Sequence, residues 1–327
     1  MKIGIRADGG LGIGMGHIVR CVTLAKELRK RNDVFFICKV NKNTPNKYLP
    51  GINFILKNNF KIKEIDEVEL EKEIIKIEAD CIITDSYDVD EKYFNLLKDN
   101  FNFSGCFDDE KICEYFNVDF IINQNFYGKY IKYNINNNTR MLLGSDYIIL
   151  RDEFRNTKEE RIINKEIKNI MITVGGSDYD NNTEKLIKQF WRENYILHVV
   201  IGSGFENIDK LKKYECDKVK LYFNVSMKDL MQLSDICISS CGTTIYELIA
   251  LGIPFIGVKV VENQEMLFDY IYEYSLGEVS EIEDVYNKIK NLTYERRLEL
   301  SKKLPNIIDG SGVERITNVI NNLIDVC

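Results

Sequence analysis

One of the two histidines in this 327-residue chain stands at the end of a glycine-rich stretch, residues 9–16, just before an apolar helical pattern. The stretch follows a short apolar run, so it joins the carboxyl end of a predicted strand to a predicted helix. Ligands bind at such ends in open α/β sheets, glycines let a backbone approach a bound group, and a helix N-terminus favours neutral imidazole. His17 is therefore a candidate general base; the plainer interpretation is a tight turn with histidine as the helix cap.

Two further small-residue turns follow predicted strands in the second half of the chain. The segment 174–178, Val-Gly-Gly-Ser-Asp, is a candidate phosphate-facing loop, although Ser177 or Asp178 could instead cap the next helix. The segment 239–244, Ser-Ser-Cys-Gly-Thr-Thr, offers hydroxyls and amides to a diphosphate at a helix start. Glu247 lies one turn later, where its carboxylate either accepts hydrogen bonds from ribose hydroxyls or only complements the helix dipole.

Carboxylates also follow two predicted strands of the first half. Asp85 ends one apolar run, and Asp108 and Asp109 end another. At the carboxyl ends of parallel strands these side chains, with Tyr87, would face a ligand cleft. The alternative is that they are helix caps and turn residues.

The elements that must position these residues alternate between strand and helix patterns along the chain, and the order restarts near residue 168. This alternation is typical of doubly wound α/β domains. The length of 327 residues is enough for two cores. We expect the boundary within residues 149–162, which gives domains 1–155 and 156–327.

Composition excludes several classes of protein. The formal net charge is −7 and no long basic run occurs, so a nucleic-acid partner is not expected. No apolar run reaches the length of a membrane span, and no signal peptide is evident, so we expect a cytoplasmic protein without a membrane partner. The nine cysteines lack the spacing of a metal clip, so no metal is expected. Four of them, Cys21, Cys38, Cys81 and Cys237, lie inside apolar runs, which predicts reduced, buried thiols.

Together, these motifs resemble the UDP-2,4-diacetamido-2,4,6-trideoxy-β-L-altropyranose hydrolases of pseudaminic acid biosynthesis (PseG family). The resemblance is carried by the segments 6–25, 84–97, 107–110, 122–128, 142–154, 173–178, 239–252 and 262–264. It implies a glycosyltransferase-B architecture, in which two Rossmann-like domains flank a cleft. It also implies that domain 1–155 holds the sugar and the catalytic group, whereas domain 156–327 binds UDP.

The activity implied by the resemblance is hydrolysis of a UDP-linked 2,4-diacetamido-2,4,6-trideoxyhexose to UDP and the free sugar. His17 would deprotonate a water that attacks the anomeric carbon with inversion, without a cofactor or metal. The substrate-binding residues implied are Gly14, Gly16, Arg20, Asp85, Tyr87, Asp108, Asn125, Gly175, Gly176, Ser177, Asp178, Ser239, Ser240, Gly242, Thr243, Glu247, Asn263 and Gln264.

Three alternatives stay open. A glycosyltransferase of the same fold would use His17 to activate an acceptor hydroxyl in place of water. A UDP-sugar-binding protein without activity would release no UDP, and a 2-epimerase would isomerise its sugar. In each case we expect a monomer whose partner is a UDP-sugar.

Overall fold

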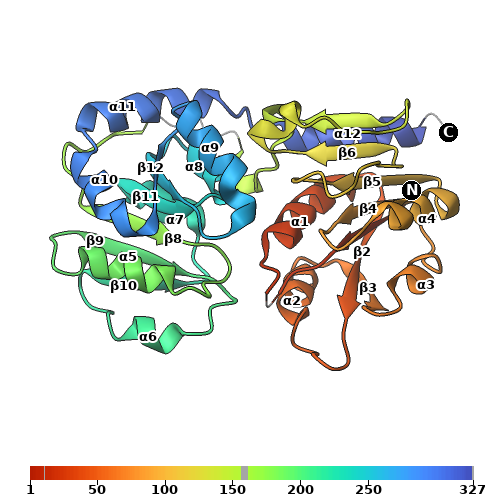
Figure 1. Cartoon of the computed structure of the whole chain (residues 1–327), viewed down its shortest axis with the longest axis horizontal. Helices are drawn as coiled ribbons and strands as arrows, with labels where there is room; N and C mark the ends of the chain where they lie inside the picture. Colours follow the sequence, from red (N-terminus) through yellow and green to blue (C-terminus); the bar gives the residue numbers. More distant parts are fainter. Residues whose placement is uncertain (11, 156–160, 326–327) are drawn as a thin grey trace. The chain divides into compact units, whose positions relative to one another are not determined.

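The computed structural model describes residues 1–10, 12–155 and 161–325, which form two compact α/β units (Figure 1). Unit 1 comprises Met1–Arg151 and Ser311–Cys327, and unit 2 comprises Asp152–Gly310. The strands of unit 1 are β1 (Lys2–Ala7), β2 (Asp33–Val40), β3 (Lys61–Asp66), β4 (Cys81–Asp85), β5 (Phe103–Phe107), β6 (Phe120–Asn123) and β7 (Arg140–Leu143). Its helices are α1 (Gly16–Leu28), α2 (Leu49–Lys57), α3 (Leu70–Ile74), α4 (Glu91–Asn100) and α12 (Gly312–Asp325), with 3-10 turns η1 (Phe126–Tyr130) and η2 (Ser145–Tyr147).

The sheet of unit 1 has the order β3-β2-β1-β4-β5-β6-β7, and all its strand pairs are parallel. The direction of winding reverses between β1 and β4, so the carboxyl ends of these two strands flank the topological switch point. Their register pairs Ala7 with Asp85. Because ligands bind at switch points of such sheets, the fold brings the glycine loop after β1 next to Asp85.

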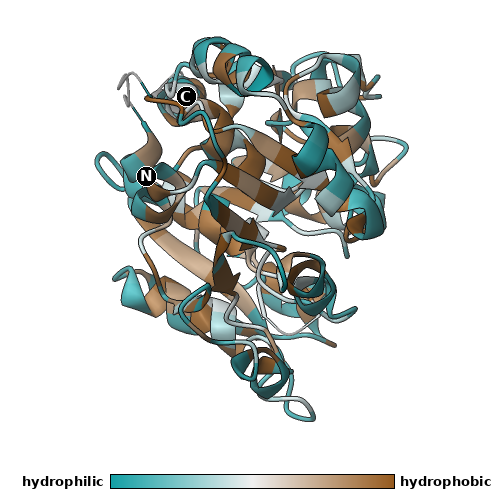
Figure 2. Ribbon diagram, turned by 90° about the vertical axis from the view of Figure 1, so that its left-hand side faces the viewer, coloured by the Kyte–Doolittle hydropathy of each residue, from teal (hydrophilic) through white to brown (hydrophobic). Residues whose placement is uncertain are grey.

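Helices cover both faces of this sheet, as its strands require. Alternate residues of β2 point to opposite sides: Phe36 packs in the cluster that includes α1 and α12, and Phe35 and Ile37 pack in the cluster that includes α4. Figure 2 shows the strands mostly in hydrophobic colours and the outer helices and loops mostly in hydrophilic ones. Burial on two faces explains why these strands are near-continuous apolar runs.

The last helix corrects the predicted domains. We predicted that residues 156–327 form the second domain, but α12 packs into unit 1, where Val313, Ile316 and Ile320 join the core beside α1. Asn321 also accepts a hydrogen bond from Asn32, which lies between α1 and β2. An amphipathic helix packs where a matching apolar face is uncovered, and here that face belongs to unit 1. The predicted boundary itself adjoins residues 156–160, which lie outside the described residues.

Unit 2 repeats the arrangement of unit 1. Its strands are β8 (Asn169–Thr173), β9 (Ile196–Ile201), β10 (Val219–Phe223), β11 (Ile236–Ser240), β12 (Phe255–Val258) and β13 (Glu278–Ser280), in the parallel order β10-β9-β8-β11-β12-β13. Its helices are α5 (Asn182–Phe190), α6 (Ile208–Lys212), α7 (Met227–Leu233), α8 (Thr244–Ala250), α9 (Glu265–Glu273), α10 (Val285–Asn291) and α11 (Tyr294–Lys303). Its 3-10 turns are η3 (Asp152–Phe154), η4 (Glu262–Gln264), η5 (Ile282–Asp284) and η6 (Leu304–Asn306). Here the switch point lies between β8 and β11, where Thr173 pairs with Ser239.

Some predicted elements differ in extent. The sequence of residues 66–79 predicts one helix, but the structure has only α3 there, because Asp66 closes β3 and the residues after Ile74 lead into β4. The predicted burial of Cys21, Cys38, Cys81 and Cys237 is confirmed. In the ranges that the structure describes, no helix has both the length and the apolar character needed to cross a membrane.

Candidate active site

The glycine loop of unit 1 folds into a small closed turn before α1. The N–H of Gly10 donates to the carbonyl of Gly14 at 3.0 Å, and the N–H of Gly14 donates back at 3.0 Å. Gly14 has φ +82°, which only glycine adopts without strain. A Cβ on Gly14 or Gly16 would meet no atom within 4 Å, so the loop leaves open space beside the helix start, as a ligand loop requires.

His17 does not cap α1. The capping position is Met15, which makes no side-chain cap bond, and His17 lies within the first turn. Its imidazole, 13% exposed, instead places Nδ1 2.5 Å from Oδ1 of Asp85 at the end of β4. The two residues are 68 positions apart in the sequence and meet because α1 begins at the switch point where β4 ends.

Arg20 binds the same carboxylate from one helical turn further along α1. Its Nε donates to Oδ2 and its Nη2 donates to Oδ1 of Asp85, both at 2.7 Å. Burial opposes ionisation of Asp85, but Arg20 and then His17 outweigh it and hold its pKa well below the usual range. The Asp85 side chain is 1% exposed, so it is a buried, ionised acceptor.

Asp109 anchors the other side of Arg20. It receives Nη1 of Arg20 at 2.8 Å, Nδ2 of Asn125 at 2.6 Å and the hydroxyl of Tyr87 at 3.0 Å. The Tyr87 ring meets the His17 ring edge-on at 4.8 Å between centroids. The structure therefore brings four predicted site residues, His17, Asp85, Tyr87 and Asn125, together around Arg20, and Asp109 links Arg20 to Tyr87 and Asn125.

Asp108 has a structural position instead. Its carboxylate accepts the N–H groups of Lys111 and Ile112 at 2.8 and 2.9 Å and the Tyr133 hydroxyl at 2.7 Å. Burial raises its pKa despite these hydrogen bonds. Asp108 is thus a turn residue, as the plainer interpretation holds, and its predicted contact with substrate stays a prediction.

A second charged cluster near this switch point was not predicted. The fully buried Arg6 donates Nη2 to Asp88 at 2.9 Å and to Asp8 at 3.3 Å, and Lys39 pairs with the same two carboxylates. Burial opposes ionisation of Asp88, but Arg6 and Lys39 together lower its pKa. The sequence carries a signal for this cluster, because Arg6 lies within the apolar run 2–7 and Lys39 within the apolar run 33–40. A charge that is buried in such a run requires a partner.

In unit 2, the two predicted small-residue turns lie side by side at the switch point. Gly175 has φ +108°, and a Cβ there would lie 3.6 Å from the Ser240 hydroxyl. In the described part of the chain, the N–H groups of Gly176, Ser177, Thr243 and Thr244 have no hydrogen-bond acceptor. Unpaired N–H groups next to serine and threonine hydroxyls suit the oxygens of a phosphate.

The other predicted residues of unit 2 have varied surroundings. Asp178 accepts the N–H groups of Asn182 and Thr183 at 2.7 and 2.8 Å, so its carboxylate caps α5. Gln264 accepts the N–H of Val260 at 3.1 Å. Ser239, Ser240 and Glu247 are buried, Gly242 and Thr243 are half-buried, and Asn263 is exposed. None of these contacts tests whether the residues bind substrate, which stays a prediction.

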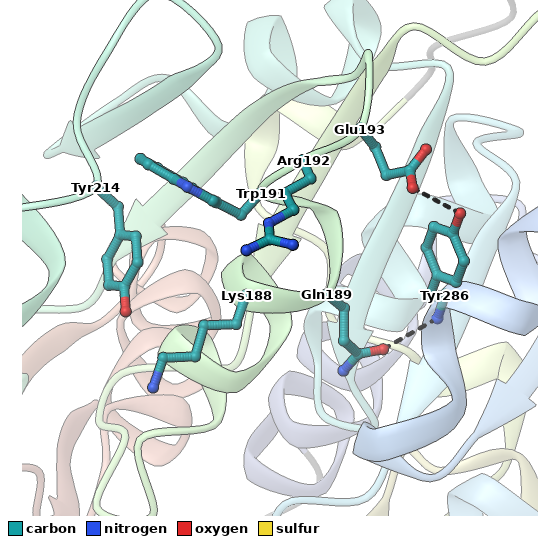
Figure 3. Close-up of a pocket in the computed structure, with 7 residues that line it drawn as sticks. All are labelled: Lys188, Gln189, Trp191, Arg192, Glu193, Tyr214 and Tyr286. Carbon is teal, nitrogen blue, oxygen red and sulfur yellow. Dashed lines mark hydrogen bonds between the residues drawn. The ribbon is translucent and has the colours of Figure 1, made fainter.

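A separate cavity of about 510 Å³ on unit 2 contains none of the predicted residues (Figure 3). Lys188, Gln189, Trp191, Arg192, Glu193, Tyr214 and Tyr286 line it. The Tyr286 hydroxyl donates to Glu193 at 2.8 Å, and its backbone N–H donates to Gln189 at 3.1 Å. Several polar groups of this cavity thus pair with one another, in contrast to the unpaired N–H groups at the strand ends.

A model of a known protein family matches most of unit 2. Residues 169–297 match the family model described as the glycosyltransferase family 28 C-terminal domain. This segment contains both small-residue turns of unit 2. It covers the strands β8–β13 and with them the switch point of the second sheet.

Several relatives align with most of the chain, and two of them are described here. The uncharacterized protein MJ1062 of Methanocaldococcus jannaschii is 32% identical over 305 residues, which cover 88% of this chain and 61% of the relative. The chain therefore spans about three fifths of that relative's length. The UDP-2,4-diacetamido-2,4,6-trideoxy-beta-L-altropyranose hydrolase of Campylobacter jejuni is 27% identical over 278 residues, which cover 81% of this chain and 94% of the relative.

The fold is also that of a solved glycosyltransferase-type structure. The structure of Acinetobacter baumannii MurG matches with a TM-score of 0.66 and 11% identity, over 98% of this chain and 99% of that chain. With the two parallel sheets, this likeness confirms the predicted α/β architecture of two Rossmann-like units of the glycosyltransferase-B type. The likeness concerns the fold alone, and the predicted cleft stays a prediction.

Proposed function

We propose that the chain is an inverting hydrolase of UDP-sugars, and that its substrate is a UDP-linked 2,4-diacetamido-2,4,6-trideoxyhexose used for pseudaminic-type (nonulosonic) acid biosynthesis. The observation that carries the proposal is the part-exposed imidazole of His17, fixed beside a glycine loop with open space at Gly14 and Gly16. The name of the C. jejuni relative supports the substrate class.

In the proposed reaction, His17 takes a proton from a water molecule as the water oxygen bonds to the anomeric carbon. The bond between that carbon and the diphosphate oxygen breaks, and UDP leaves with its electron pair. Attack from the side opposite UDP inverts the anomeric centre. A positioned base of this kind contributes about 10²–10⁴-fold to the rate.

UDP itself is proposed to bind unit 2. The unpaired N–H groups of Gly176, Ser177, Thr243 and Thr244 support a diphosphate site, because donors aimed at the departing oxygen stabilise developing charge. Glu247, on α8 after the second turn, is the proposed ribose ligand. The family model match over residues 169–297 supports the same assignment.

The decisive experiment measures UDP release without any added acceptor. Purified chain is incubated with a panel of UDP-2,4-diacetamido sugars, and the products are read by mass spectrometry and NMR. We expect equal amounts of UDP and free sugar, with the first-formed anomer inverted.

The second candidate is a glycosyltransferase, which the family 28 match favours. It would release UDP only when a sugar or lipid acceptor is supplied, and the sugar would appear on that acceptor. UDP release that strictly requires an acceptor would therefore replace the hydrolase proposal.

A further inference from the structure

The two nitrogens of the His17 ring have different surroundings. Nδ1 lies 2.5 Å from Oδ1 of Asp85 and 3.4 Å from Nη2 of Arg20, which donates to Oδ1 of Asp85 at the shorter 2.7 Å. Within residues 1–10, 12–155 and 161–325, Nε2 has no hydrogen-bond partner. A neutral imidazole carries its proton on only one nitrogen. Which nitrogen carries it decides whether the other can act as a base.

Asp85 can only accept hydrogen bonds at this position. Two N–H groups of Arg20 and the thiol of Cys21, at 3.3 Å, already point at its oxygens. An ionised carboxylate has no proton to donate, so the hydrogen in the short contact must come from Nδ1 of His17. The lone pair of the neutral ring is then on Nε2, away from Asp85.

The carboxylate is itself prevented from moving. Arg20 binds it through two parallel hydrogen bonds, a geometry that fixes orientation, and packs over the Phe107 ring at 4.8 Å. Asp109 holds the far side of the guanidinium at 2.8 Å. A rotation of Asp85 would break both bonds to Arg20, so the ring orientation of His17 is determined by a buried, fully paired network.

We propose that Asp85 is a positioning residue, which keeps His17 in the Nδ1–H tautomer and directs Nε2 to the reacting water, while Arg20 and Asp109 hold Asp85 in place. This revises the expectation that Asp85 touches substrate, because its oxygens are already occupied by His17, Arg20 and Cys21. The role in rate rests on the proposed function, but the tautomer does not.

Histidine NMR tests the tautomer directly, because the chain has only two histidines. In the full chain labelled with ¹⁵N-histidine, long-range ¹H–¹⁵N spectra at pH 8 should show His17 protonated at Nδ1 and bare at Nε2. His198 serves as the internal reference. A wild-type His17 protonated at Nε2 would overturn the proposal without any variant.

The variant Asp85→Asn should reduce the Nδ1–H form of His17 to a minority. The amide NH₂ of the variant replaces one of the two acceptor oxygens of the carboxylate. When the remaining oxygen accepts from Nε of Arg20, the NH₂ faces Nδ1 of His17 and disfavours a proton on that nitrogen. The control is Asp90→Asn, since Asp90 caps α4 by accepting the N–H of Tyr93 at 2.9 Å and asparagine caps equally well. It should leave the His17 signals unchanged. A folded Asp85→Asn protein that keeps the Nδ1–H form contradicts the positioning role.

Kinetics give the second readout. With a donor that wild type hydrolyses, Asp85→Asn should lower kcat by about 10²–10⁴-fold and change KM by less than about threefold. Adding His17→Asn should cost little more, because residues that act as a unit are not additive. If Asp85→Asn keeps more than about a tenth of kcat, positioning is wrong while hydrolysis stands. If wild type hydrolyses no donor, the proposed function is wrong while the NMR result still decides the tautomer.

Discussion

At the scale of single residues, the chemistry of unit 1 depends on which atoms already have partners. Asp108 and Asp109 are neighbours in the sequence, yet Asp108 accepts backbone N–H groups of its own turn, whereas Asp109 accepts hydrogen bonds from the side chains of Arg20, Tyr87 and Asn125. Only the latter set touches the surroundings of His17. A substitution at Asp108 is therefore expected to disturb the fold of the turn, whereas one at Asp109 is expected to disturb the positions of the side chains around His17.

The replacement His17→Asn should abolish the base while keeping a polar side chain of similar size. We expect the hydrolytic rate to fall by about 10²–10⁴-fold or more. UDP affinity, measured by calorimetry, should stay near wild type because the proposed nucleotide contacts lie on unit 2. Turnover above about a tenth of wild type would move the search for a base to the strand-end carboxylates Asp85, Asp108 and Asp109.

His198, in unit 2, should make the free energy of unfolding depend on pH. It lies in β9, 2% exposed, with its ring nitrogens 2.9 Å from the Tyr222 hydroxyl and 3.0 Å from Oδ1 of Asn169. Burial, and then the charge of Lys220, lowers its pKa below the usual 6.5.

The consequence for stability has a definite sign. The unfolded chain binds this proton near pH 6.5 and the folded chain only at lower pH, so the free energy of unfolding should fall as pH drops below about 6.5 and level off below the folded pKa. Titration of the His198 NMR signal measures the folded value. A midpoint above 6.5 would show that burial does not dominate there.

At the scale of elements, Asp178 belongs to a motif with two interpretations, a phosphate-facing loop and a helix cap. Its carboxylate receives the first two N–H groups of α5, so Asp178→Ala should lower the free energy of unfolding by about 0.5–2 kcal/mol. Urea denaturation checks this, with Asp178→Asn as the variant that keeps a capping oxygen. Loss of UDP binding in a folded Asp178→Asn protein would instead indicate a direct phosphate contact.

Several elements were predictable because their patterns agree with the fold. The runs at 33–40 and 81–85 became β2 and β4 since both faces of each are buried. The sequence predicts helix α2 less clearly, because Pro50 and Gly51 lie in its first turn and such a pair is typical of a loop. Strand β3 carries four charged side chains among six residues and lies at the sheet edge.

The candidate site likewise contains one contact that the sequence pattern predicts and others that it does not. The contact of His17 with Asp85 follows from strand-end positions, which the alternating pattern predicts. The separate roles of Asp108 and Asp109 do not, because they depend on a turn in which Lys111 adopts φ +59°. The pairing of Arg20 with Asp109 likewise depends on packing between α1 and β5, and no local pattern encodes it.

At the scale of the whole molecule, unit 2 is inserted into unit 1 ahead of α12. The fragment 152–310 should therefore fold and bind UDP in calorimetry. The fragment 156–327 carries α12 without its partner surface, and the exposed Val313, Ile316 and Ile320 should make it self-associate in sedimentation experiments. A folded 152–310 fragment that binds no UDP would place nucleotide contacts outside unit 2.

The insertion also sets the order of events on the ribosome. The first 151 residues emerge before unit 2, but the face of α1 that α12 covers stays open until the last helix is made. At about 5–20 residues per second, the 159 residues of Asp152–Gly310 take on the order of 8–30 s to translate. Throughout that interval the nascent chain exposes an apolar face of α1, so we expect newly made unit 1 to bind chaperones that recognise exposed apolar surface, whereas unit 2 can fold as soon as it emerges.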